Sequence, residues 1–310
     1  MRTHVISRLI EKARQDDRIV LLVGDLGYNV VEEFQKEFPQ RFINCGIAEQ
    51  NMMSVAAGMA LEGDKVFVYS IGNFPTLRCL EQIRNDVCYH NADVNIISVG
   101  GGFSYGSLGM SHHTTEELAI LRSLPEMKVY APADYYEANA VLDDVCKNNG
   151  PSYMRLARGR DSVFYSNPIF SIDTIIPYRE YNDENYEVTI ISTGTILEEA
   201  INAERLLEEK GVSTRVFSCP SIKPLDTNGI LRLFETSKIV VSLEEHNYIG
   251  GLGSAIAETI SSNRAHAPLL RIGLNDIYSS QVGSTEYLRK YYLLDGENVC
   301  NRIIKELEQL

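Results

Sequence analysis

Short apolar runs alternate with amphipathic stretches along most of the chain. The run Ile19–Val23 contains five consecutive apolar residues, which is the length and character of a buried strand. In the 75–90 segment, apolar residues recur every three or four positions, which is typical of an amphipathic helix. Apolar strands that alternate with helices predict a parallel sheet covered on both faces.

The same pattern places the other elements of the first half. Expected helices cover 3–16, 29–37, 49–62, 75–90, 115–123 and 134–147, and expected strands cover 19–23, 65–69, 94–99, 127–131 and 152–156. A short apolar strand also ends at Gly46, and the helix that follows has Glu49 in its first turn.

The stretch 159–187 interrupts this alternation with two prolines and a polar run, as a linker between domains does. Alternation then resumes, with expected strands at 187–192, 213–218, 238–243 and 268–272 and helices at 195–210, 227–235, 251–262 and 297–309. A length of 310 residues also suggests about two domains. We therefore predict an α/β protein with domains 1–160 and 187–310 and a linker at 161–186.

Composition narrows the classes of function. A net charge of −13 argues against nucleic acid and against anionic membranes, because both attract basic surfaces. No apolar run is long enough to span a bilayer, and no charged-then-apolar leader opens the chain. The six cysteines lie in hydrophobic segments without CxxC spacing, which indicates free thiols and a cytoplasmic location.

Glu49 is the first candidate for chemistry. Its surroundings in residues 41–60 are largely apolar, so an ionised carboxylate there is costly unless something pairs with it. A cationic or proton-accepting ligand would be a suitable partner. The alternative is an acidic residue that only stabilises the helix N-terminus. From this segment alone, both interpretations remain open.

Residues 46–50, GIAEQ, closely resemble a segment of the transketolase and deoxyxylulose-phosphate synthase family. Further stretches resemble family motifs in the same order, namely 74–86, 109–113, 121–125, 131–134, 150–155, 192–195, 242–246 and 250–253. No single stretch is decisive, but their common order is specific. The resemblance implies a pyrimidine-binding domain with a parallel sheet, followed by a smaller transketolase C-terminal domain.

The resemblance also implies a cofactor, thiamine diphosphate, and residues that bind it. Glu49 would be the essential catalytic residue, bonded to the aminopyrimidine ring. Ile47, Tyr69, Phe74 and Arg78 would contribute to cofactor binding, and core packing is the alternative for the two aromatic residues. Arg78 could instead face solvent.

Other matched positions imply contacts with substrate. His112 would lie at the reacting carbons, where an imidazole can shuttle a proton near neutral pH. His113, Arg155 and Arg158 would also bind substrate, and an interdomain salt bridge is the alternative for the arginines. We predict no metal site at the two histidines, because no third ligand is evident.

Two loops add to this interpretation. The glycine-rich stretch 100–106 would let the backbone approach a ligand closely. In the loop before His112, Leu108 stands where transketolases have an aspartate that recognises a substrate hydroxyl. Since leucine cannot form that hydrogen bond, we expect a non-standard sugar substrate.

The family's diphosphate motif, GDG followed by an asparagine, has its nearest match at 24–27, where no suitable ligand pair follows. The resemblance therefore implies the C-terminal subunit of a split transketolase, which transfers a two-carbon ketol unit between sugars. An N-terminal partner subunit would hold the diphosphate and Mg²⁺, in an α2β2 heterotetramer. The alternatives are the beta subunit of a 2-oxo acid dehydrogenase, a deoxyxylulose-phosphate-synthase-like enzyme, and a non-catalytic regulatory or scaffolding subunit.

Overall fold

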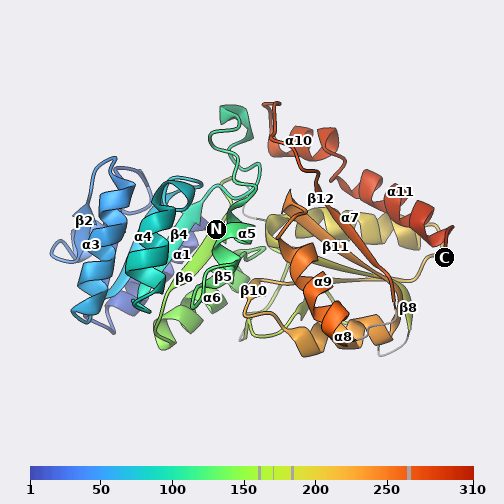
Figure 1. The fold of residues 1–310 in the computed structure, drawn as a ribbon, viewed down its shortest axis with the longest axis horizontal. Coiled ribbons are helices and arrows are strands. Elements are labelled where there is room, and N and C mark those ends of the chain that lie inside the picture. Colours follow the sequence, from blue (N-terminus) through green and yellow to red (C-terminus); the bar gives the residue numbers. More distant parts are fainter. Residues whose placement is uncertain (160–161, 170, 183–184, 264–266) are drawn as a thin grey trace.

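The chain folds into two sheets that lie next to each other in the computed structural model (Figure 1). The structure describes residues 1–159, 162–169, 171–182, 185–263 and 267–310. The larger sheet has the strand order β10-β5-β6-β4-β3-β1-β2, and the smaller has the order β12-β11-β8-β9-β7. The predicted α/β class with parallel sheets is confirmed, while the predicted boundary at 160 and 161 lies outside the described residues.

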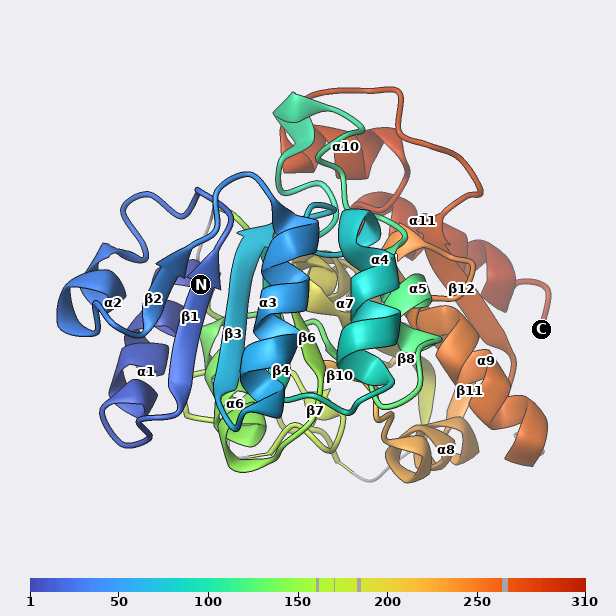
Figure 2. The ribbon, with the colours of Figure 1, turned by 60° about the vertical axis from the view of Figure 1, so that its left-hand side comes forward.

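The larger sheet is parallel except for its edge strand β10. Its strands are β1 (Ile19–Val23), β2 (Phe42–Asn44), β3 (Lys65–Ile71), β4 (Val94–Val99), β5 (Lys128–Tyr130), β6 (Ser152–Leu156) and β10 (Ser221–Lys223). Its helices are α1 (Arg2–Ala13), α2 (Glu32–Glu37), α3 (Glu49–Leu61), α4 (Leu80–Gln82), α5 (Glu117–Arg122) and α6 (Tyr135–Lys147). Apolar residues of α1 and α6 cover one face, and those of α3 and α5 cover the other (Figure 2).

The smaller sheet is also sandwiched between helices. Its strands are β7 (Ile176–Pro177), β8 (Tyr186–Thr193), β9 (Thr214–Ser218), β11 (Ser237–Asn247) and β12 (Leu269–Leu274). Its helices are α7 (Leu197–Glu208), α8 (Thr227–Glu235), α9 (Leu252–Asn263), α10 (Thr285–Tyr291) and α11 (Gly296–Leu307). Helices α7 and α11 cover one face, and α8 and α9 cover the other. Among the described residues, no helix is long and apolar enough to cross a membrane.

The expected 75–90 helix is divided into three helical types. A 3₁₀ turn at Leu77–Cys79 leads into the short α4, and a π-helical segment follows at Ile83–Cys88. The expected apolar positions Ile83 and Val87 are buried. The apolar spacing predicted the buried face. It could not distinguish the three helical types, because each of them turns one side of the helix toward the sheet. π-Helical segments are rare and often occur at functional sites.

Two further elements differ from the prediction. Strand β7 lies inside the expected linker 161–186 and pairs antiparallel with β9, so part of that segment belongs to the smaller sheet. Helix α10 was not predicted. Both elements are too short to show a clear hydrophobic period.

Strand β10 crosses from the second half of the chain to the first sheet. It pairs antiparallel with β5, where Ser221 lies opposite Tyr130. The side chain of Ile222 is buried in the core beneath α3 and α5. The larger sheet is therefore built from both halves of the sequence.

The packing of β10 can be tested with Ile222→Ala. Removal of buried methyl groups there should lower the free energy of unfolding by about 2–5 kcal/mol. Urea denaturation measures this change. The control is Leu61→Ala, because Leu61 is 58% exposed and its loss should cost no more than about 0.5 kcal/mol. Equal effects of the two substitutions would show that β10 does not pack as described.

Candidate active site

The candidate site lies where the carboxyl ends of β1 and β3 meet the start of α3, as ligand sites in parallel sheets usually do. The turn before α3 places Glu49 in the first turn of this helix, and its side chain is only 2% exposed. Its Oε1 lies 3.3 Å from the position that a Cβ on Gly24 would occupy. A glycine at the end of β1 therefore leaves room for the carboxylate.

Arg78 neutralises this buried carboxylate. Its Nη1 donates a hydrogen bond to Oε2 of Glu49 at 2.7 Å, and no described residue donates one to Oε1. The N-cap residue of α3 is Ala48, which forms no side-chain hydrogen bond with the start of the helix. The pair satisfies a charge that would otherwise be costly to bury, and it leaves one carboxylate oxygen available to a ligand.

Aromatic rings extend the site from this ion pair. The Arg78 guanidinium lies 4.5 Å from the centroid of the Phe74 ring, a cation–π distance. The Phe74 ring in turn meets the ring of His112 edge to face at 5.4 Å. The structure thus brings together four of the residues predicted from the sequence, which come from three separate segments.

Tyr105 continues this cluster and was missed by the sequence analysis. Its ring centroid lies 6.0 Å from that of His112, and the exposed Arg158 guanidinium lies 4.6 Å from it. Ser111 Oγ is 3.0 Å from Nδ1 of His112. An aromatic residue in the glycine-rich 100–106 loop was the available signal for Tyr105.

Tyr69 and Ile47 lie differently from the other predicted cofactor residues. Tyr69 is buried in the core between the sheet and α1, and this burial raises the pKa of its phenol to about 12. The core-packing alternative therefore describes Tyr69. Ile47 is 80% exposed in the turn before α3, and its contact with a cofactor stays a prediction.

His113 points away from solvent, in contrast to the prediction that it binds substrate. Its Nε2 lies 3.1 Å from the carbonyl oxygen of Gly106, and its ring meets that of Phe103 edge to face at 5.2 Å. The side chain is buried and holds the loop together. Among the described residues, no group of three His, Cys, Asp or Glu side chains could hold a metal ion.

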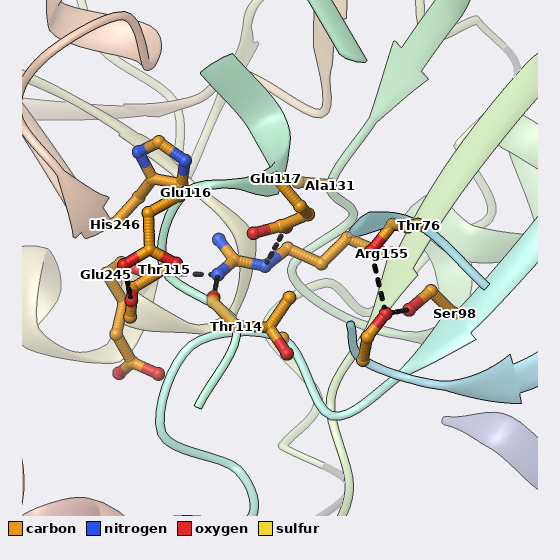
Figure 3. A network of polar contacts seen from close by, with 12 residues as sticks. Thr76, Ser98, Thr114, Thr115, Glu116, Glu117, Ala131, Arg155, Glu245 and His246 are labelled. Carbon is orange, nitrogen blue, oxygen red and sulfur yellow. Dashed lines mark hydrogen bonds and ion pairs between the residues drawn. The ribbon is translucent and has the colours of Figure 1, made fainter. Parts of the chain in front are cut away.

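Arg155 forms a salt bridge within the larger-sheet domain and a hydrogen bond to the smaller one, where the sequence predicted a contact with substrate or, as the alternative, an interdomain salt bridge. Its buried Nε lies 3.1 Å from Oε1 of Glu117. Its Nη2 donates to the carbonyl oxygens of Thr114 and of Glu245 in the smaller sheet (Figure 3). Nε and Nη2 are engaged in these contacts, and a contact of Arg155 with substrate stays a prediction. The nearby Arg160 lies outside the described residues.

The sequence suggested that the glycine-rich loop at 100–106 approaches a ligand. In the structure, Gly102 of this loop instead approaches the side chain of Glu245. A Cβ on Gly102, whose φ is +59°, would lie 2.0 Å from Oε1 of Glu245. A larger residue at position 102 would have to displace this carboxylate. The glycine therefore serves the contact between the two sheets.

Two further polar residues, Glu244 and His246, lie at the end of β11. Glu244 accepts hydrogen bonds from the N–H groups of Leu252 and Gly253 at the start of α9, and burial raises the pKa of its carboxyl to about 7. His246 Nε2 accepts from the N–H of Ala119 at 3.4 Å. Burial, with a contribution from the nearby Arg155 charge, lowers the pKa of His246 to about 3.

Comparisons with known proteins agree with this architecture. The family model for the transketolase pyrimidine binding domain matches residues 1–160, and that for the transketolase C-terminal domain matches 178–299. A transketolase C-terminal section of Methanocaldococcus jannaschii is 39% identical over 302 residues, which cover 97% of this chain and 94% of that protein. An apulose-4-phosphate transketolase subunit of Phocaeicola vulgatus is 34% identical over 298 residues, which cover 96% and 94%.

A solved structure is also similar over nearly the whole chain. It is a split-gene transketolase in the form of an inactive β4 tetramer, with a TM-score of 0.89 and 33% identity. The match covers 99% of this chain and 98% of that one.

The fold and the site together define an α/β protein in which a pyrimidine-binding domain precedes a C-terminal domain. The chain belongs to the transketolase family, whose members depend on thiamine diphosphate. It corresponds to the C-terminal subunit of split transketolases, which transfer ketol groups and act with a partner subunit. The family resemblance inferred from the sequence is confirmed.

The buried His246 predicts a pH dependence of folding. Its pKa is near 3 in the folded protein against an ordinary value of 6.5, so the unfolded chain binds the extra proton between these values. Stability is therefore lost as the pH falls below 6.5, by up to about 1.4 kcal/mol per pH unit. Urea denaturation between pH 6.5 and 4.5 should show a flatter profile for His246→Gln.

The control for this measurement is His90→Gln, because His90 is exposed. Its profile should match that of the unmodified protein. Glu244 acts in the opposite direction between pH 4.5 and 7, but it is present in all three proteins. Identical profiles for His246→Gln and the unmodified protein would contradict the assignment.

Proposed function

We propose that this chain, with an N-terminal partner, transfers a two-carbon ketol unit between sugars as a split thiamine-diphosphate-dependent transketolase. The observation that carries the proposal is the cluster of Glu49, Arg78, Phe74 and His112 at the carboxyl ends of β1 and β3. When bound, thiamine diphosphate supplies a carbon nucleophile for a ketose carbonyl and stabilises the negative charge that follows.

The polar atoms at this site suit the aminopyrimidine ring of that cofactor. Oε1 of Glu49 has no donor among the described residues. Ser70 Oγ is buried without a hydrogen-bond partner there and, like Oε1, lies within 3.5 Å of the position of a Cβ on Gly24. Glu49 would bond a ring nitrogen through Oε1, while Arg78 holds Oε2 and Phe74 supplies an aromatic surface.

His112 and Arg158 would serve the substrate. Ser111 engages Nδ1 of His112, and no described residue bonds Nε2, so this nitrogen can hold or move a proton at a substrate oxygen. The exposed guanidinium of Arg158, on the other side of Tyr105, suits a phosphate or carboxylate group of a sugar.

The domain organisation and the partner extend the proposal. Residues 1–160 would form the pyrimidine-binding domain and 187–310 the C-terminal domain, and a partner subunit would hold Mg²⁺ and the diphosphate in an α2β2 assembly. The names of the relatives, one a C-terminal section and the other a subunit, support a partner. A cytoplasmic location is consistent with six free cysteines.

The role of Glu49 is tested with Glu49→Ala in the complex reconstituted with the partner subunit. Loss of the carboxylate should lower turnover by about 10²–10⁴-fold or more, because a general acid–base group is removed. Circular dichroism should be unchanged. Glu62→Ala, at the exposed end of the same helix, is the matched control and should retain activity. Turnover within tenfold of the unmodified complex would show that Glu49 only begins a helix.

The need for a partner is tested with the purified chain alone. We expect no ketol transfer and weak cofactor binding, because the groups that hold the diphosphate would be supplied by the other subunit. The similar split-gene transketolase is inactive as a β4 tetramer. Calorimetric titration with thiamine diphosphate, a coupled assay and light scattering measure binding, activity and assembly. Micromolar cofactor affinity together with turnover by the chain alone would contradict the proposal.

The loop beside His112 supports a non-standard substrate. Leu108 and Met110 are 51% and 54% exposed, so this loop presents apolar groups where the resemblance expects a carboxylate. A site without that hydrogen bond loses selectivity for the hydroxyl it would recognise. The substrate would be a modified sugar such as a deoxy or nucleotide-linked ketose, or a 2-oxo acid would be the donor. The relative named for apulose 4-phosphate also acts on an unusual sugar.

Leu108→Asp tests this part of the proposal. The substitution should raise kcat/KM for xylulose 5-phosphate with ribose 5-phosphate relative to the unmodified complex, because a hydroxyl partner is restored. Met110→Asp adds the same charge to the same loop and should not have this effect.

The unmodified complex should prefer another substrate, such as apulose 4-phosphate, a deoxy ketose, or pyruvate with glyceraldehyde 3-phosphate. The last pair tests the synthase-like alternative. If the ordinary pair reached about 10⁴ M⁻¹s⁻¹ and no other substrate exceeded it, the argument from Leu108 would be wrong.

A further inference from the structure

The loop that carries His112 is anchored at its start in the smaller sheet domain. The ring of Phe103 is buried in the core formed with α7, α11 and α10. Its N–H donates to Oε1 of Glu245 at 2.7 Å, and its carbonyl oxygen accepts from Oγ1 of Thr285 at 3.1 Å. The start of the loop is therefore attached to β11 and to α10, and α10 lies beside the loop in Figure 1.

The end of the loop is held by the same strand. The carbonyl oxygen of Thr114 accepts from the N–H of Gly102 and from Nη2 of Arg155. The same Nη2 donates to the carbonyl oxygen of Glu245 at 3.0 Å (Figure 3). One residue later, the carbonyl oxygen of Thr115 accepts from the N–H of Asn247 at 2.8 Å. Both ends of the loop are thus attached to β11.

Contacts inside the loop transmit the position of these ends to His112. The buried ring of His113 is bonded to Gly106 and packed on Phe103, so the loop is tied across its width. Asn73, from the other sheet, donates to the carbonyl oxygen of His113 at 2.8 Å. His112 therefore belongs to a loop that is fixed to β11, and its ring lies against Phe74, in the segment that follows β3.

Glu245 is the residue on which these contacts converge. Its carboxylate accepts from Phe103 on one oxygen and from Nε of Arg289 on the other. Arg289 is itself buried, with Glu199 at 3.5 Å and Oγ1 of Thr195 at 3.3 Å. Because a buried ion pair with two defined partners has one favourable geometry, Glu245 places the start of the loop accurately.

We propose that Glu245 is a positioning residue for catalysis, through which the C-terminal domain sets the place of the His112 imidazole in the active site. Glu245 has no contact with the Glu49 cluster, and its effect passes through the loop. The inference rests on the proposed role of His112.

The test uses the complex with the partner subunit and the variant Glu245→Gln. Glutamine has the same size, but its NH₂ group must face either the N–H of Phe103 or the guanidinium of Arg289, and both are donors. We expect kcat to fall by about 10–100-fold, because small displacements of a catalytic group have effects of this size. The KM and the Kd for thiamine diphosphate should stay within about threefold of the unmodified values, since neither cofactor nor substrate contacts are removed.

Glu204→Gln is the matched control. Glu204 is equally buried in the same domain and pairs with Arg179 and Tyr181, none of which contacts the loop. Its loss should lower Tm and leave kcat unchanged. A similar kcat for the two variants would overturn the proposal, because the effect of Glu245 would then be only structural.

A double-mutant cycle identifies the route of the effect. If Glu245 acts through His112, Glu245→Gln should cause no further loss of kcat in a His112→Ala background, and additive losses would overturn the proposal. Full activity of His112→Ala alone would instead refute the proposed role of His112. If Glu245→Gln fails to assemble, Thr285→Val is the second test. This substitution removes the hydrogen bond from Thr285 to the carbonyl oxygen of Phe103. An unchanged kcat would overturn the proposal.

Discussion

A buried guanidinium joins the two sheets of this protein. Arg155, at the end of β6, lies in a low-dielectric interior where its charge and its N–H groups must find partners. It finds a carboxylate, Glu117, in its own half and the carbonyl oxygen of Glu245 in the other. The hydrogen bond from Arg155 to Thr114 attaches the loop that carries His112 to the same point. Arg155 therefore fixes both the contact between the two sheets and the position of that loop.

The halves are further interlocked by apolar side chains that cross between them. Ile222 from the second half fills the core of the first sheet, and Phe103 from the first half fills the core of the second. Burial of large apolar side chains stabilises each crossing by about 1.5–3 kcal/mol. If the two halves of the chain moved apart, Ile222 and Phe103 would become exposed. Their burial therefore stabilises the contact between the domains.

The candidate active site contains a second ion pair, which is arranged differently. Glu49 and Arg78 form an ion pair in which Arg78 is still partly exposed, so the buried carboxylate has a partner without being closed off. Arg155 and Arg289, by contrast, are enclosed and bonded within the protein. Glu49 therefore keeps one oxygen for a ligand, whereas Arg155 and Arg289 are engaged with groups of the protein itself.

The sequence by itself determined the α/β class and the buried faces of the long elements, because hydrophobic periodicity depends on neighbouring residues. Local motifs also singled out Glu49, Phe74, Arg78 and His112, which the structure brings together. Only the tertiary structure showed that Tyr69 and His113 are buried, that Arg155 joins the two sheets, and that Tyr105 lies beside His112 in the candidate site. The same was true of the edge strand β10, whose place depends on its pairing with β5, which is distant in the sequence. Burial and long-range pairing arise when segments far apart in the chain meet, and no local pattern records which of several polar or aromatic residues will be enclosed.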